Sequence, residues 1–257
     1  MIVDSEKAKT LLDQPVLPAT ADELRRQDSV FFVGCNLPTR QALETVFESD
    51  CQSPADLFVF SFAGTADFHQ AEALIGSIKK NFKGYLYGQF NAIPSGRLIE
   101  NAYAAGIDYI DIPLIGDYEQ RVRALRYALT VFPRWSAIST LYLTDREPGL
   151  THQSIDMLIE NDILPLVAFK SGLDHFPAAE IVTIFEHLAK SWRDRKASVK
   201  PLQPLLYLTT PFAPPASKGI VHSLFDRAND ARLRTASDLR RLLRVREVEE
   251  SFESAGL

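Results

Sequence analysis

Cysteine is scarce in this chain, which has only Cys35 and Cys51 among its 257 residues. Two thiols are too few for a disulfide framework, and too few for a metal site built from several cysteines of one chain. The histidines His69, His152 and His175 lie at unrelated spacings and form no His-x-x-x-His pattern. The sequence therefore predicts free thiols and no metal site.

Long apolar runs and net positive charge are missing as well. The first residues, MIVDSEKAKTLLDQPVLP, lack the basic start and the uninterrupted apolar run of a secretion signal, and no later stretch is long enough to cross a bilayer. The formal net charge of -5 gives no overall positive field that would attract a phosphate backbone. We expect a cytoplasmic protein whose partners include neither a membrane nor a nucleic acid.

What the chain does contain is an ordinary globular composition, with 46% hydrophobic and 24% charged residues. This supplies enough apolar surface for a sizeable core. The length of 257 residues is also common for an α/β barrel that forms one unit around one core. One large domain with tails is the expected organisation.

Short β-rich runs alternate with helical patterns along most of the chain. Seven runs are typical of strands: Ser29–Val33, Leu57–Phe62, Tyr85–Phe90, Tyr109–Leu114, Ala137–Leu143, Leu164–Phe169 and Leu205–Thr209. Six segments between them have helical periodicity: Arg40–Phe47, Ala66–Asn81, Ser95–Ala105, Tyr118–Phe132, Thr151–Asn161 and Ala178–Arg195. This succession predicts a parallel sheet covered by helices. We expect a (β/α) barrel of the TIM type, complete or partial and open on one side, with a doubly wound open sheet as the alternative.

The two ends of the chain differ from this repeating part. Residues 1–27 are polar, with a short helical signal at Ala21 to Arg26, and are interpreted as a lead-in segment. Residues 28–212 form the predicted barrel domain. The prolines of TTPFAPPASK then interrupt regular structure, and residues 213–257 are expected to form a helical appendage with helices at Ile220–Ala231 and Ala236–Phe252. These last helices are the expected contact with a protein partner.

The run VFFVGCNLPTRQA, residues 30–42, resembles the first strand and cluster loop of the radical S-adenosylmethionine enzymes. In that family a strand ends in Cys-Asn-Leu, and further cysteines follow four and seven positions after the first, as CxxxCxxC. Here Cys35 is followed by Thr39 and Ala42 at those positions. Three thiolates hold the family's four-iron cluster, and neither threonine nor alanine supplies one. The resemblance therefore implies a relative that has no iron-sulfur cluster.

Later runs are similar to the biotin-synthase-like branch of the same family. RLIENAYAAGIDYIDIPL resembles its helix and fourth strand, and the layout from residue 132 to residue 169 resembles its fifth strand, next helix and sixth strand. Glu147 is kept from the fifth-strand motif Gly-x-Ile-x-Gly-x-x-Glu, while Thr140, Tyr142 and Thr144 replace its other residues. The second strand ends at Gly64 instead of a Gly-Gly-Glu-like turn. The resemblance implies a barrel fold, with S-adenosylmethionine as one ligand to consider.

Candidate functional residues follow from the rule that barrel sites lie at the carboxyl ends of strands. By the resemblance, the strand that carries Asp111 reaches the ribose of S-adenosylmethionine; the alternative is a structural role for this carboxylate with a lysine or a backbone amide. Gln89 and Asn91 share a strand face, where they either bind a ligand or satisfy each other. Lys170, after an apolar strand, is a candidate Schiff-base nucleophile or else a solvated lysine. The predicted ligand-binding residues are Gly64, Gln89, Asn91, Asp111 and Glu147, and the predicted catalytic residue is Lys170.

Three hypotheses follow, and they leave open whether the chain is an enzyme. The first is an accessory or small-molecule-binding protein with a degenerate radical S-adenosylmethionine barrel, which binds S-adenosylmethionine or another molecule without reducing it. The second is a barrel lyase of the Schiff-base, aldolase-like type that uses Lys170, with Asp111 or Glu147 as acid or base. The third is a structural partner that acts through its C-terminal helices.

Overall fold

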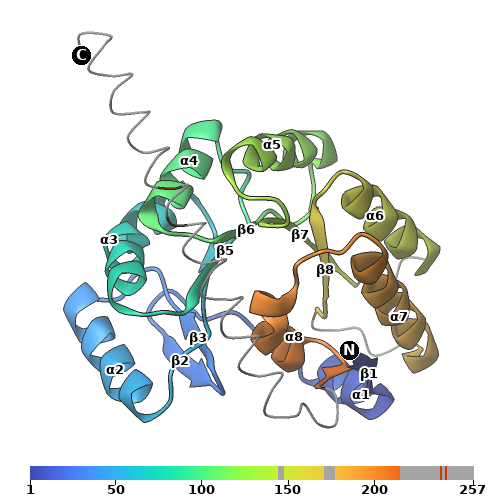
Figure 1. Ribbon diagram of the computed structural model, residues 1–257, viewed down its shortest axis with the longest axis horizontal. Coiled ribbons are helices and arrows are strands. Elements are labelled where there is room, and N and C mark those ends of the chain that lie inside the picture. Colours follow the sequence, from blue (N-terminus) through green and yellow to red (C-terminus); the bar gives the residue numbers. More distant parts are fainter. Residues whose placement is uncertain (144–147, 171–176, 215–237, 239–240, 242–257) are drawn as a thin grey trace, which may run out of the picture. The chain divides into compact units, whose positions relative to one another are not determined.

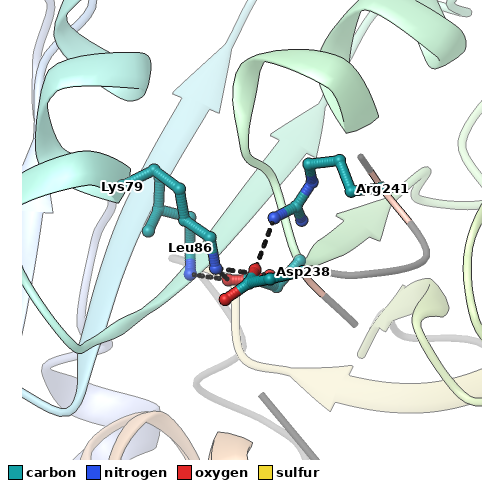
Figure 2. Close-up of polar contacts among 5 residues, drawn as sticks. Lys79, Leu86, Asp238 and Arg241 are labelled. Atoms are coloured by element: carbon teal, nitrogen blue, oxygen red, sulfur yellow. Dashed lines mark hydrogen bonds and ion pairs between the residues drawn. The ribbon is translucent and has the colours of Figure 1, made fainter. Parts of the chain in front are cut away.

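The computed structural model describes residues 1–143, 148–170, 177–214, 238 and 241. The chain divides into two compact units, Met1–Pro214 and Pro215–Leu257. Within the second unit, Arg241 forms an ion pair of 2.9 Å with Asp238, three residues earlier (Figure 2). The predicted helix Ile220–Ala231 lies outside the described residues, and so does nearly all of Ala236–Phe252. No helix in the described part of the chain is both long and apolar enough to span a membrane.

The first unit is an α/β structure built on a seven-stranded, mostly parallel sheet (Figure 1). Its strands are β2 (Leu24–Gln27), β3 (Val30–Val33), β4 (Leu57–Phe62), β5 (Tyr85–Phe90), β6 (Tyr109–Asp111), β7 (Ala137–Tyr142) and β8 (Leu164–Ala168). Strands β3 to β8 are parallel, and β2 pairs antiparallel with β3. The spatial order follows the chain from β2 to β8 without a reversal, so each crossover joins neighbouring strands.

The helices between the strands lie around the outside of the sheet (Figure 1). They are α2 (Thr39–Gln52), α3 (Thr65–Asn81), α4 (Gly96–Ala105), α5 (Tyr118–Val131), α6 (Pro148–Glu160) and α7 (Ala178–Asp194). Their ends follow local chemistry. At α4, for example, the Ser95 hydroxyl accepts the Leu98 N–H at 3.2 Å, and Gly106 ends the helix with a φ of 123°. The six helices and the first six strands predicted from the sequence are confirmed, apart from shifts at their ends.

The strands are apolar on both sides because both sides of the sheet are covered. In β4, for instance, Phe58 and Phe60 are fully buried on one side, and Val59 is 7% exposed on the other. The outer side packs against α2 to α7. The inner side needs a different cover, and one segment that the sequence did not predict correctly helps to provide it.

This segment is Leu205–Thr209, and its prediction as a strand is wrong. These residues form helix α8 (Gln203–Thr209), which follows the short 3-10 helix η1 (Lys200–Leu202) and lies on the inner side of the strands (Figure 1). Pro201 and Pro204 are the second residues of these two helices, within the first turn, where the missing N–H breaks no hydrogen bond of the helix. Leu205 and Leu206 are buried. A short apolar run has no period long enough to separate a strand from a helix.

Nearer the N-terminus, the helical signal predicted at Ala21 to Arg26 is also wrong. β2 begins at Leu24 and pairs with β3 through a two-residue turn, in which Asp28 has a φ of 52°. A helix does form earlier, as α1 (Ser5–Asp13), with Asp4 as its N-cap. Pairing with a neighbouring strand thus outweighs a weak local helix preference.

The two ends of the first unit are joined by a small antiparallel ladder. Strand β1 (Ile2–Val3) pairs with β9 (Phe212–Ala213), with Val3 opposite Phe212. Lys7 on α1 strengthens the junction because its ammonium donates to the carbonyl oxygens of Tyr207 and, at 2.9 Å, of Phe212. The start of the chain is therefore part of the same compact unit as the sheet.

A buried ion pair fixes α3 against the sheet. The carboxylate of Asp108, just before β6, accepts from the Lys79 ammonium at 2.9 and 3.1 Å and from the Leu86 N–H at 3.0 Å. Asp108 is only 5% exposed, so these donors replace the water that burial removed.

Candidate functional site

A cavity of about 360 Å³ lies on the inner side of the sheet. Lining residues two apart along a strand, such as Val59 and Ser61 or Tyr87 and Gln89, share a face because strand side chains alternate. The lining comprises Pro15, Val16, Leu17, Pro18, Phe32, Val59, Ser61, Tyr87, Gln89, Thr140, Tyr142, Leu166, Val167, Ala168, Phe169, Lys170, Leu205, Leu206, Thr209 and Thr210. Strands β3, β4, β5, β7 and β8 thus provide one wall, and α8 and the segment after α1 provide the other.

Asp111, at the end of β6, is the buried anion behind this cavity. It has no exposed surface, and it is not itself a lining residue. One carboxylate oxygen, Oδ2, accepts from the Tyr87 hydroxyl at 2.6 Å and from the Gln89 amide at 2.7 Å. The hydroxyl of Thr140 also donates to Oδ2 at 2.6 Å, and the backbone N–H of Thr140 donates to Oδ1 at 2.8 Å. Three neighbouring strands therefore converge on one carboxylate.

The electrostatics of this cluster follow from its burial. Burial raises the pKa of Asp111 because it penalises the charged form, and the hydrogen bonds from Thr140, Tyr87 and Gln89 oppose that rise. Burial, and then the nearby negative charge of Asp111, raises the pKa of Tyr87 well above 10. The same two causes raise the pKa of Tyr142 to about 12. Both tyrosines are therefore neutral hydrogen-bonding groups at pH 7.

The structure separates the two polar residues predicted on β5. Gln89 lines the cavity and bonds to Asp111, and its Oε1 accepts from the Tyr142 hydroxyl at 3.4 Å. Asn91 is not a lining residue, and its side-chain amide donates to the Ser61 hydroxyl at 3.2 Å. The two side chains share no hydrogen bond in the described network.

Arg121 on α5 is a supporting residue that the sequence analysis missed. Its guanidinium donates to the carbonyl oxygens of Pro113 at 2.8 Å and of Asn91 at 2.6 Å, so it joins the ends of β5 and β6. Burial lowers the pKa of Arg121, while the negative charges of Asp111 and Asp117 oppose that change. Arg121 is 7% exposed. A signal was present in the sequence, because Arg121 falls in register with the buried, apolar face of α5.

The remaining predicted site residues lie in three different places. Gly64 is the N-cap of α3, where its N–H donates to Asp67 at 3.1 Å, and it does not line the cavity. Lys170 does line the cavity, but its side chain is exposed. An exposed ammonium keeps its water and lacks the apolar surroundings expected for a Schiff-base lysine. Glu147 lies outside the described residues.

The loop that resembles a cluster loop is covered by the N-terminal segment. Cys35 is buried after β3, and burial raises the pKa of its thiol. The Gly34 N–H donates to the Glu23 carbonyl and the Asn36 N–H to the Ala21 carbonyl, both at 2.8 Å. A Cβ on Gly34 would lie only 2.2 Å from the Ala21 oxygen, so only glycine fits beneath this segment.

Both cysteines are free, with Cys51 exposed on α2. Of the positions that hold cysteine in the radical enzymes, Thr39 begins α2 and Ala42 is buried. Among the residues that the structure describes, no three His, Cys, Asp or Glu side chains are placed to hold a metal ion together.

Comparison with protein-family models and with curated proteins gave no match. The resemblance to the radical S-adenosylmethionine enzymes therefore rests on the sequence features described above. What the geometry itself offers is an apolar cavity with a hydrogen-bonding floor that is organised around Asp111. Such a site is suited to holding a small molecule.

Proposed function

We propose that this chain binds a small, largely apolar molecule in the cavity between the sheet and α8, and that it does not transform the molecule chemically. The observation that carries this proposal is the network on Asp111. Its carboxylate already accepts four hydrogen bonds from Tyr87, Gln89 and Thr140. A carboxylate engaged in this way orients its donors and is poorly placed to take a proton from a ligand.

The tyrosine at the cavity supports a binding role as well. With a pKa of about 12, the Tyr142 hydroxyl is a weak base and a weak acid at neutral pH. Among the described lining residues, the charged side chain is that of Lys170, which is exposed. The walls are largely apolar, with Phe32, Leu166 and Phe169 among them. These are features of a site that holds a ligand by burial and a few directed hydrogen bonds.

The proposed origin of this binding protein is a cluster-less, barrel-like relative of the radical S-adenosylmethionine enzymes. The strand order from β3 to β8 supports an incomplete barrel, because it never reverses as a doubly wound sheet does. Thr39 and Ala42, where the family has cysteines, support the loss of the cluster. An accessory role would follow, with residues 213–257 as the proposed contact with a protein partner.

S-adenosylmethionine belongs in the ligand panel because of this resemblance. Tyr87 and Tyr142 would offer aromatic faces to its adenine, whereas the ammonium of Lys170 would repel its sulfonium. We therefore expect uncharged apolar molecules to bind more tightly than S-adenosylmethionine.

A fragment screen by ligand-observed NMR tests the proposed function. Ala168 lines the cavity, so Ala168→Phe should fill part of it and weaken the bound fragments at least about tenfold. Ala73→Phe, at an exposed position on α3, is the matched control and should leave binding unchanged. Equal binding to both variants and the unmodified protein would place the ligands elsewhere and contradict the proposal.

A Schiff-base lyase is the second candidate, because Lys170 does line the cavity. An amine there would attack the carbonyl of a keto acid, lose water and form an imine, which borohydride reduces to a stable secondary amine. The exposure of Lys170 leads us to expect no labelling above that of other surface lysines. Selective labelling of Lys170, lost in Lys170→Met, would favour the lyase over the binding protein.

A further inference from the structure

The polar floor of the cavity, which consists of Tyr87, Gln89 and Thr140, offers a ligand more hydrogen-bond acceptors than donors. Tyr87, Gln89 and Thr140 line the cavity and donate to Asp111 at 2.6, 2.7 and 2.6 Å. Because an ionised carboxylate only accepts, each of these side chains uses one of its hydrogens on Asp111. The two hydroxyls then have no further hydrogen to donate, but each keeps a lone pair.

The amide of Gln89 is oriented by the same carboxylate. Reversing it would set its carbonyl oxygen against the Asp111 oxygen, where two acceptors repel each other. Its NH₂ group therefore faces Asp111, and its Oε1 faces Tyr142. The Tyr142 hydroxyl lies 3.4 Å from that oxygen, which is a long and weak hydrogen bond. Gln89 Oε1 is thus an acceptor that a ligand can still use.

We infer that the cavity selects molecules whose buried end is an uncharged hydrogen-bond donor, such as a hydroxyl, an amide N–H or a ring N–H. This inference rests on the proposed function and names the ligand class for that same site. A donor would satisfy Gln89 Oε1, because Gln89 is the partly exposed side chain of the three, whereas Tyr87 and Thr140 are each only 3% exposed. An anionic end placed against the floor would face lone pairs of these side chains and, behind them, the carboxylate of Asp111, which outnumber the one N–H that Gln89 keeps. Lys170, elsewhere in the lining, would repel a cationic ligand.

Indole and benzofuran form a matched pair of probes, because they have nearly the same shape and differ in a ring N–H against a ring oxygen. Their dissociation constants should be measured with the full chain by ligand-observed NMR titration at one pH and salt concentration. We expect indole to bind at least about tenfold more tightly, since an unpaired acceptor buried against benzofuran loses its water without gaining a donor. This comparison needs no variant to fold.

Two variants connect the preference to the cavity floor. Gln89→Met keeps the length of the side chain but removes Oε1, so the preference for indole should fall to within about threefold. Gln70→Met makes the same replacement at an exposed position on α3 and should keep the full preference.

The outcomes separate this inference from the proposed function. Equal affinities, or tighter binding of benzofuran, would overturn the donor preference and leave a binding protein of different selectivity. A preference that persists in Gln89→Met at full size would overturn the role given to Gln89 Oε1, and with it the inference. No measurable binding of either probe would count against the proposed function, and the inference would fall with it.

Discussion

Asp111 shows how one residue determines the character of the site. Its carboxylate is fully buried, yet four donors from β5 and β7 surround it. Sequence patterning could select this residue because a carboxylate within the apolar run YIDIPL demands partners. It could not name the partners, since Thr140 lies on a strand that meets β6 only in the folded chain.

The raised pKa of Asp111 predicts a pH dependence of stability. Well below pH 3.8 the carboxyl is protonated in both the folded and the unfolded chain. As the pH rises from the ordinary value of 3.8 toward the folded pKa, the unfolded chain releases its proton first, so the folded state loses stability. Asp111→Asn has no such titration. The difference in unfolding free energy, variant minus wild type, should therefore increase with pH and then level off.

Urea denaturation of both proteins from pH 3.5 to pH 8 measures this difference. Asparagine can still accept from Thr140, so a folded variant is expected. Curves that stay parallel over the whole range would show that Asp111 has the same pKa in the folded and unfolded states, contrary to its burial.

Other residues of the site were less accessible to sequence reasoning. Gln89 was selected by its position at a strand end, and the structure places it in the cavity lining. Arg121 was overlooked because a charged residue on a helix is usually solvated, although its register with the apolar face of α5 marked it. Lys170 was selected by its position after an apolar strand, and the structure places it in the cavity lining with an exposed side chain, but the sequence could not decide between a nucleophile and a solvated lysine.

At the scale of elements, strands and helices with a long or clear period were predictable. The six helices around the sheet have repeating apolar faces, and strands such as β4 and β5 are bounded by turn residues. The failures were short segments whose conformation depends on tertiary packing. α8 has only seven residues, and β2 exists because β3 offers it a partner.

The segment that covers the loop after β3 provides a test at this scale. Gly34→Ala would bring a Cβ to 2.2 Å from the Ala21 oxygen and 2.4 Å from the Thr20 oxygen. Neither backbone carbonyl can move without breaking the contacts of the segment, so we expect a loss of about 1–3 kcal/mol in unfolding free energy. Amide hydrogen exchange at Gly34 and Asn36 should also become faster, because these amides donate to that segment.

Gly76→Ala is the matched control in α3. Its new Cβ would find its nearest atom, the Ala105 oxygen, at an ordinary 3.8 Å. Alanine in a helix interior is favoured over glycine by about 0.5–1 kcal/mol, so this variant should be more stable than wild type. If the two substitutions changed the unfolding free energy equally, the covering segment would be able to move away from the new Cβ at position 34 without loss of stability.

At the scale of the whole first unit, the sheet and its surrounding helices could be predicted, but the closing contacts could not. The alternation of strands and helices implied a parallel sheet. Nothing in the two residues of β1 or of β9 indicates that they pair, because the ladder joins positions more than 200 residues apart. Contacts between residues that lie so far apart along the chain produce no periodic pattern of apolar residues in the sequence.

Phe212 tests how much this closure contributes to stability. It is fully buried, and its ring lies 5.4 Å from that of Phe185 and 5.6 Å from that of Trp192. Phe212→Ala should cost about 3–5 kcal/mol in urea denaturation. Ile2→Ala changes the same ladder at a residue that is 62% exposed and should stay within about 0.5 kcal/mol of wild type. A small effect of Phe212→Ala would show that the unit is stable without this closure.

The cavity is lined by residues from both ends of the first unit, by Pro15 to Pro18 and by Leu205 to Thr210, together with the strands between them. During synthesis, the ribosome delivers the residues of one wall before the strands of the sheet and those of the other wall after them. A nascent chain can therefore form the sheet before the second wall of the cavity has been made. We expect the ligand to have no influence on the early steps of folding and to stabilise only the completely folded unit.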